Sequence, residues 1–146
     1  MAAMSIDSAA SLVRVVDDSA DAAESLALVL ELEGFRTLTA HDGRSALDRI
    51  GQQRPDAVLL DLGLPDLDGV EVGRRIRALA DGAGILLVAL SGHGGQDDLA
   101  ATRAAGFDAH LVKPVDPGRI VALLGARRGP AANPGTPIAA TWSKTR

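Results

Sequence analysis

Five polar side chains each follow directly on a short, mainly apolar segment of this sequence. They are Asp17, Asp18, Asp61, Ser91 and Lys113. Such segments, rich in branched apolar residues, are typical of strands buried on both faces of a parallel sheet. The carboxyl ends of parallel strands lie at one edge, where open α/β sheets bind their ligands. We therefore expect these five side chains to meet at one site.

The types of these side chains suit phosphoryl transfer to an aspartate. Crowded carboxylates repel one another unless a cation sits among them, and Mg²⁺ prefers oxygen ligands while keeping several waters. With Mg²⁺ bound, Asp61 can stay ionised and act as a nucleophile. Mg²⁺, the Lys113 ammonium and the Ser91 hydroxyl can then each contact one phosphoryl oxygen. Asp61 is the predicted phosphoryl acceptor.

Each of these residues also has an ordinary structural interpretation. Asp17 or Asp18 alone could cap the following helix, and Asp61 alone could open a turn. Ser91 could be a loop serine, and Lys113 a solvated surface lysine. The coincidence of all five at predicted strand ends favours a functional site over these separate interpretations.

The rest of the chain alternates between predicted strands and helices. Strands are expected over residues 12–16, 35–40, 57–60, 85–90 and 109–112, each followed by a helix. Ser19 or Asp21 should cap the helix after the first strand, and Leu28 and Leu32 should widen its apolar face. Gly125 should close the last helix.

The alternation of five strands and five helices predicts a parallel sheet covered on both faces. The first, third and fourth strands are the most apolar and should be central, whereas the second suits an edge. A flavodoxin-like, doubly wound α/β sheet of order 2-1-3-4-5 satisfies these conditions. We expect one domain over residues 11–125, a disordered segment at 1–10 and a flexible tail or linker at 126–146.

Composition excludes several classes of function. The 146 residues include no cysteine, which excludes disulfides, thiolate metal sites and thiol nucleophiles. A formal net charge of −4 gives no reason to expect a nucleic-acid surface, and no basic recognition helix is visible, so direct DNA binding is not expected. No apolar segment approaches the roughly 20 residues that cross a bilayer, and no signal peptide is evident. We therefore expect a cytoplasmic protein without a membrane partner.

In their order along the chain, these motifs resemble the receiver domains of response regulators in two-component signalling. The matching segments are 15–18, 59–65 with Asp68-Gly69, 89–92, and 104–108 leading to Lys113-Pro114. The resemblance covers about residues 11 to 125. It implies the fold predicted above, a cis Lys113-Pro114 bond, and phosphorylation of Asp61 by a histidine kinase or a histidine phosphotransfer protein.

The resemblance also implies roles for individual residues. Asp18 and Asp61 would ligate Mg²⁺ by their side chains, Asp17 would act mainly through water, and Gly63 would contribute its backbone carbonyl. Ser91 would be the switch hydroxyl that moves toward the phosphoryl group. Its movement would change the surface formed by the fourth helix, fifth strand and fifth helix for a downstream protein target.

Three positions depart from the most familiar receiver pattern. Gly63 stands where a longer polar residue is common, and His93 lies two residues after Ser91; both flank the water that would hydrolyse an acyl phosphate. His110 stands where an aromatic switch residue often lies. It either turns inward when Ser91 moves, or is a solvated histidine on a short edge strand, and the sequence leaves both open.

We expect a signalling domain that promotes its own phosphorylation and dephosphorylation but is not a turnover enzyme. It would act as a monomer or a weak phosphorylation-dependent dimer, alone or as the receiver of a hybrid kinase. One alternative is a Mg²⁺-dependent phosphohydrolase with an aspartyl-phosphate intermediate, although Gly63 lies where such enzymes often carry a second acid and no cap domain is visible. Another is a binding module that is never phosphorylated, although such modules usually lack part of the acidic set.

Overall fold

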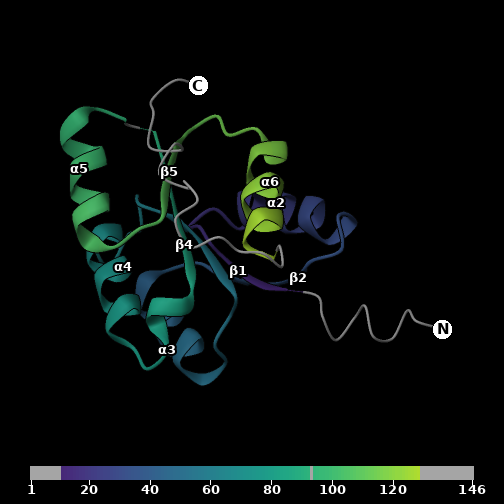
Figure 1. The fold of residues 1–146 in the computed structure, drawn as a ribbon, viewed down its shortest axis with the longest axis horizontal. Helices are drawn as coiled ribbons and strands as arrows, with labels where there is room; N and C mark the ends of the chain where they lie inside the picture. Colours follow the sequence, from purple (N-terminus) through teal and green to yellow (C-terminus); the bar gives the residue numbers. More distant parts are fainter. Residues whose placement is uncertain (1–10, 93, 129–146) are drawn as a thin grey trace.

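Five parallel strands form one sheet in the order β2-β1-β3-β4-β5, with helices on both of its faces (Figure 1). The computed structural model describes residues 11–92 and 94–128. Residues 127 and 128 are described by their backbone alone. The strands are β1 (Leu12–Val16), β2 (Arg36–Ala40), β3 (Ala57–Asp61), β4 (Leu86–Ser91) and β5 (Ala109–Val112). The helices are α2 (Ala20–Leu32), α3 (Gly43–Gln52), α4 (Gly69–Ala78), α5 (Gln96–Ala105) and α6 (Pro117–Arg128), with a 3₁₀ turn η1 (Gly82–Gly84). The predicted fold class and strand order are confirmed.

The register of the sheet aligns the ends of the central strands. Val16 of β1 pairs with Leu60 of β3, and Asp61 pairs with Leu90 of β4. Because all strands run in the same direction, the residues that follow β1, β3, β4 and β5 meet at one edge. The three central strands are buried throughout, as their apolar sequences predict.

Two apolar layers hold the helices on the sheet. Side chains alternate along each strand, so Leu59 of β3 joins the layer beneath α2 and α6, whereas Leu60 joins the layer beneath α3, α4 and α5. With only two phenylalanines and one tryptophan in the sequence, the core consists mainly of branched aliphatic residues and alanine. These layers fix the carboxyl edge of the sheet in place.

The prediction for the apolar face of α2 was partly wrong. Leu28 is 56% exposed and Leu32 is 78% exposed, and the residues that the helix buries are Ala23, Ala27 and Leu30. The spacing of these three is that of a narrow helical stripe, and two of its members are small. Small residues let α2 pack closely on the sheet, which leaves the larger leucines outside.

The end of the last helix also differs from the prediction, because α6 continues past Gly125 to Arg128. A glycine ends a helix when it adopts the left-handed conformation, as Gly34 (φ 97°) and Gly106 (φ 100°) do after α2 and α5. Gly125 is not among the described glycines with positive φ. The start of the predicted tail is therefore helical, while residues 1–10 and 129–146 lie outside the described residues.

A close approach between α4 and the loop before β5 gives a test of the packing. A Cβ at Gly73 would lie 2.3 Å from Cε1 of Phe107, a ring that is 4% exposed. We expect Gly73→Ala to lower the free energy of unfolding by about 1–3 kcal/mol, measured by urea denaturation. Gly51→Ala in α3, where a Cβ meets nothing within 4 Å, is the matched control and should be neutral or stabilising by about 0.5–1 kcal/mol. Equal effects of the two substitutions would contradict this packing.

Candidate functional site

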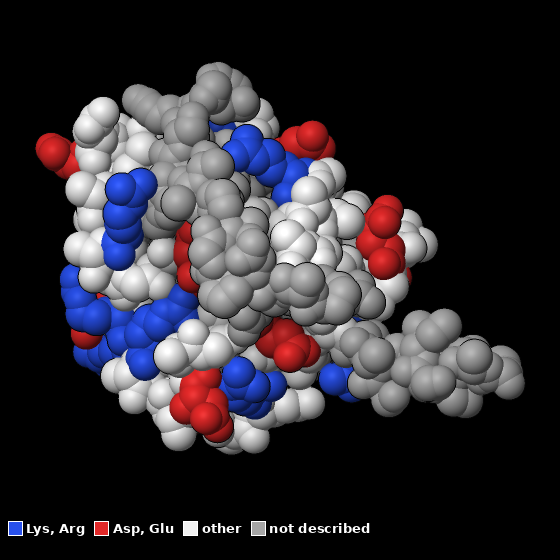
Figure 2. Space-filling model, in the orientation of Figure 1, with Lys and Arg blue, Asp and Glu red and all other residues white. Residues whose placement is uncertain are grey.

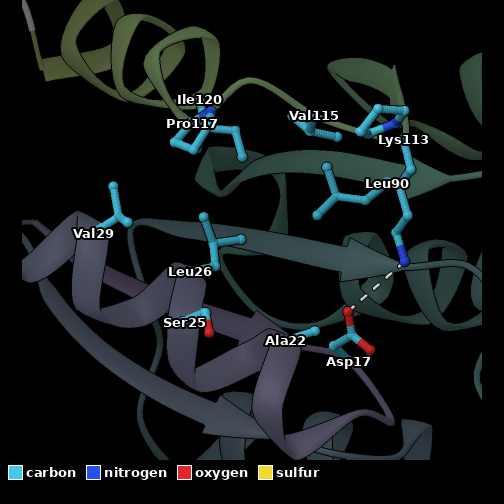
Figure 3. Close-up of a pocket in the computed structure, with 11 residues that line it drawn as sticks. Asp17, Ala22, Ser25, Leu26, Val29, Leu90, Lys113, Val115, Pro117 and Ile120 are labelled. Carbon is cyan, nitrogen blue, oxygen red and sulfur yellow. Dashed lines mark ion pairs between the residues drawn. The ribbon is translucent and has the colours of Figure 1, made fainter.

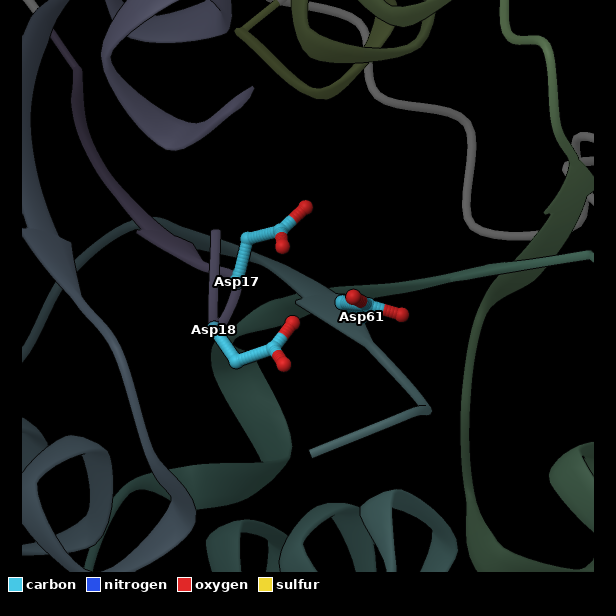
Figure 4. A group of neighbouring side chains, drawn as sticks. All are labelled: Asp17, Asp18 and Asp61. Atoms are coloured by element: carbon cyan, nitrogen blue, oxygen red, sulfur yellow. The ribbon is translucent and has the colours of Figure 1, made fainter. Parts of the chain in front are cut away.

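Three carboxylates from two neighbouring strands gather at the carboxyl edge of the sheet (Figure 4). Asp17 and Asp18 follow β1, and Asp61 is the last residue of β3. Each offers an oxygen that lies within 4.8 Å of those of the other two. Asp17 and Asp61 are buried, whereas Asp18 is exposed. The structure thus brings together the acids that the sequence predicted to meet.

Backbone amides orient the two buried carboxylates. Oδ1 of Asp17 accepts a hydrogen bond from the amide of Ser19 at 2.9 Å, and Oδ1 of Asp61 accepts one from the amide of Gly63 at 3.0 Å. Both are local turns in which an aspartate accepts from the amide two residues ahead. They hold one oxygen of each carboxylate in place, while the second oxygen of each faces Lys113.

Lys113, which directly follows β5, provides the positive charge of the site. Its Nζ lies 3.3 Å from Oδ2 of Asp61 and 3.8 Å from Oδ2 of Asp17. The Lys113-Pro114 peptide bond is cis, as expected. Lys113 is thus placed to contact a group carried by Asp61, although its partly exposed side chain makes this pair weaker than a fully buried one.

Burial raises the pKa of Asp17, and the neighbouring charge of Asp61 raises it further. The amide of Ser19 and the ammonium of Lys113 act in the opposite direction. Three clustered carboxylates beside one ammonium give a formal charge of −2, which a divalent cation would neutralise. The donors are all oxygens and Asp18 is open to water, so the cluster fits a hard cation such as Mg²⁺.

Gly63 and His93 are the predicted positions that flank the acceptor, and the structure describes the first of them. A Cβ at Gly63 would lie 3.6 Å from Oδ1 of Asp61, so this glycine stands directly beside the proposed acceptor. Its carbonyl as a metal ligand stays a prediction. His93 lies outside the described residues.

The switch positions form a buried polar chain behind the acidic cluster. Oγ of Ser91 lies 2.7 Å from Nε2 of His110, and Oγ1 of Thr102 lies 2.9 Å from Nδ1 of the same ring. Thr102 also donates to the carbonyls of Asp98 and Leu99 in α5. These contacts favour the tautomer in which Nδ1–H of His110 donates to Thr102 and Nε2 accepts from Ser91.

His110 is 1% exposed, so the interpretation as a solvated histidine was wrong. The expectation that His110 turns inward only after Ser91 moves also needs correction, because the ring already lies inside and contacts Ser91. Sequence reasoning missed Thr102 of α5, whose hydroxyl contacts His110 on the edge strand β5. The available signal was a threonine on the buried side of an alanine-rich helix.

A strand order of 2-1-3-4-5 with an acidic cluster at the carboxyl edge defines a flavodoxin-like domain whose site lies at its topological switch point. A family model described as "Response regulator receiver domain" matches residues 13–125. The chain belongs to this family, whose members receive signals in two-component systems.

Two similar relatives are mycobacterial regulators. The transcriptional regulatory protein PrrA of Mycobacterium tuberculosis is 42% identical over 123 residues, covering 82% of this chain and 52% of the relative. The DNA-binding response regulator MtrA of Mycolicibacterium paratuberculosis is 40% identical over 115 residues, covering 79% of this chain and 50% of the relative. The chain therefore spans about half the length of these relatives.

A solved structure supports the interpretation of the acidic cluster. The receiver domain of a sensor histidine kinase from Pseudomonas aeruginosa PAO1 has a TM-score of 0.75 and is 29% identical, covering 83% of this chain and 99% of that one. That protein is described with a magnesium ion coordinated in its active site cleft. The cluster of Asp17, Asp18 and Asp61 could hold such an ion.

The raised pKa of Asp17 predicts how stability depends on pH without metal. The folded state keeps this proton to higher pH than the unfolded chain, so the contribution of Asp17 to stability falls as pH rises from about 4 through its raised pKa. Asp17→Asn removes the ionisable group and therefore the loss of stability that its ionisation causes. We expect the variant to be more stable than the wild type at pH 7, and the difference to shrink toward pH 4.

Urea denaturation at both pH values, with EDTA present, measures this difference. Asp18→Asn is the matched control, because its carboxylate is exposed, and it should change stability less. A wild type more stable than Asp17→Asn at pH 7 without metal would contradict the assignment. Added Mg²⁺ should stabilise the wild type and have less effect on Asp17→Asn.

Proposed function

We propose that the chain is a phosphoacceptor that takes a phosphoryl group on Asp61 from a histidine kinase or a histidine phosphotransfer protein. The observation that supports this most directly is the position of Lys113, whose Nζ lies 3.3 Å from Oδ2 of Asp61 and opposite the acidic cluster. A lysine pointing at a carboxylate on a strand end supplies the charge that an added phosphoryl group requires.

In the proposed reaction, an oxygen of Asp61 attacks the phosphorus and the P–N bond of the donor phosphohistidine breaks. The donor imidazole leaves with the bonding electron pair, and an acyl phosphate remains on Asp61. Asp18 and Asp61 would hold Mg²⁺ through their carboxylates, Asp17 through water and Gly63 through its carbonyl. When bound, this ion would neutralise charge on the phosphoryl oxygens.

The switch would begin at the Ser91 hydroxyl. A phosphoryl oxygen on Asp61 is a stronger acceptor than Nε2 of His110, so Ser91 would leave the ring and donate to the phosphoryl group. His110 and its partner Thr102 would then rearrange, which couples the site to the α5–β5–α6 surface. The phosphoryl group shifts the population of the two states only by its differential interaction with them.

A pocket beside the acidic cluster gives the phosphodonor a surface to contact (Figure 3). It has a volume of about 340 Å³ and lies between α2 and α6. Asp17 and Lys113 border it, and apolar side chains such as Leu26 and Val115 form its walls. A donor protein seated there would bring its phosphohistidine toward Asp61.

We infer that the output is a contact with a downstream protein, made by a monomer or a weak phosphorylation-dependent dimer in the cytoplasm. No helix within the described segments is long and apolar enough to cross a bilayer. On the face in Figure 2, basic side chains gather on the side of α4 and α5, with acidic ones among them. MtrA is described as DNA-binding, so DNA binding is a measurable alternative output.

Asp61→Asn is the direct test of the acceptor. We expect Mg²⁺-dependent labelling by radioactive acetyl phosphate in the wild type and its loss in the variant, because an amide cannot form the acyl phosphate. Asp68→Asn, which can keep its role as the cap of α4, is the control and should label normally. Undiminished labelling of Asp61→Asn would overturn the proposal.

The same preparations separate the signalling function from the enzymatic alternative. As a domain that is not a turnover enzyme, the wild type should become labelled once and slowly release phosphate. Sustained hydrolysis of a small phosphate ester, abolished by Asp61→Asn, would instead favour the phosphohydrolase. A DNA-binding measurement with and without acetyl phosphate tests the nucleic-acid alternative.

The proposed donor surface predicts a difference between protein and small-molecule donors. Ser25 is exposed and lines the α2–α6 pocket, so Ser25→Arg should slow phosphotransfer from a cognate kinase by about tenfold while leaving labelling by acetyl phosphate unchanged. Leu32→Arg introduces the same charge on α2 outside the pocket and should leave both reactions unchanged. Equal slowing by both variants would place the donor elsewhere.

A further inference from the structure

Arg14 is a buried cation in the middle of a central strand. Arg14 is only 4% exposed, and the other residues of β1 are apolar. Nη1 donates to the carbonyl of Thr39 at 3.1 Å. Nε is buried and has no hydrogen-bond acceptor among the described residues. A strand position in a sheet core normally carries an apolar side chain, so this arginine calls for an explanation.

The side chain lines a pocket of about 600 Å³ between the β1–β2 edge of the sheet and α3. The other lining residues are Leu38 of β2 and, from α3 and its end, Asp48, Arg49, Gln52 and Gln53. This pocket shares no lining residue with the one beside the acidic cluster. The buried Arg14 therefore lies at the base of a polar pocket in the surface, whose other charged and amide residues are exposed.

The charges in this pocket are not balanced by close ion pairs. No carboxylate of the described residues lies within 4.0 Å of the Arg14 or Arg49 guanidinium, although Asp48 lines the same cavity. Burial and the charge of Arg49 both lower the pKa of Arg14. A buried cation without a counter-charge is costly, and an anion in the cavity would offset that cost.

We propose that this pocket binds a small organic anion, whose carboxylate or phosphate group faces the guanidinium groups of Arg14 and Arg49. The amides of Gln52 and Gln53 contact the uncharged part of the ligand. The Asp48 carboxylate disfavours a second anionic group and accepts hydrogen bonds, so the ligand carries hydroxyl or amino groups at its other end. This site does not depend on the phosphoacceptor function proposed for Asp61.

The experiment titrates two probes that differ in their anionic group, gluconate and glucose 6-phosphate, with sodium chloride at equal ionic strength as the reference. The readouts are the ¹H–¹⁵N resonance of Arg14 Nε and the melting temperature, without Mg²⁺. We expect a saturable shift of the Arg14 resonance and a rise in melting temperature with at least one probe. The stronger probe identifies whether the site prefers a carboxylate or a phosphate.

Three variants make the test specific. Arg14→Met should raise the melting temperature without a probe, because it removes the buried charge, and should abolish the probe-dependent rise. Arg49→Gln, at an exposed position of α3, should weaken binding severalfold, and Asp48→Asn should strengthen it. Arg119→Gln on α6 is the control, and it should respond as the wild type does.

The proposal fails if neither probe gives a saturable shift up to tens of millimolar, or if Arg14→Met responds as the wild type does. It also fails if Asp48→Asn weakens binding and lowers the melting temperature, because Arg14 would then be the structural partner of Asp48. Asp61→Asn should keep the full response, which separates this site from the phosphoacceptor.

Discussion

Repulsion among three carboxylates at one edge of the sheet is the constraint on which the rest of this structure depends. Asp17, Asp18 and Asp61 are held within 4.8 Å of one another because β1 and β3 are paired in parallel and end together. The apolar layers on both faces of the sheet stabilise an arrangement that the charges alone oppose. Lys113 offsets part of that repulsion, and the remaining negative charge leaves a cluster that could hold a divalent cation.

The buried chain from Ser91 through His110 to Thr102 links this electrostatic site to the packing of α5. In many protein cores the position of His110 would be apolar. A structural change at the site would then reach α5 only through steric contact. Here each ring nitrogen of His110 has a hydroxyl neighbour, so a movement of either hydroxyl changes a buried hydrogen bond of the ring. In the proposed switch, a movement of Ser91 would therefore reach β5 and α5 through these contacts.

Two polar sites on the same β1 strand have opposite character. Asp17 after its carboxyl end pairs with Lys113, whereas Arg14 in its middle shares a pocket with a second arginine. The first follows from strand ends meeting at an edge, a property of every doubly wound sheet. The second depends on one residue at a core position of this chain. A domain of this fold can therefore carry a second site beneath α3 without altering the first.

The sequence by itself determined the strand order and the residues at the strand ends, because buried parallel strands must be apolar throughout and their carboxyl ends must meet. Glycines also mark the ends of α2 and α5, where Gly34 and Gly106 adopt positive φ. Tertiary structure alone decided that Leu28 and Leu32 stay exposed, that α6 continues past Gly125, and that His110 lies inside. These outcomes depend on how closely neighbouring elements approach, which the pattern of one segment does not specify.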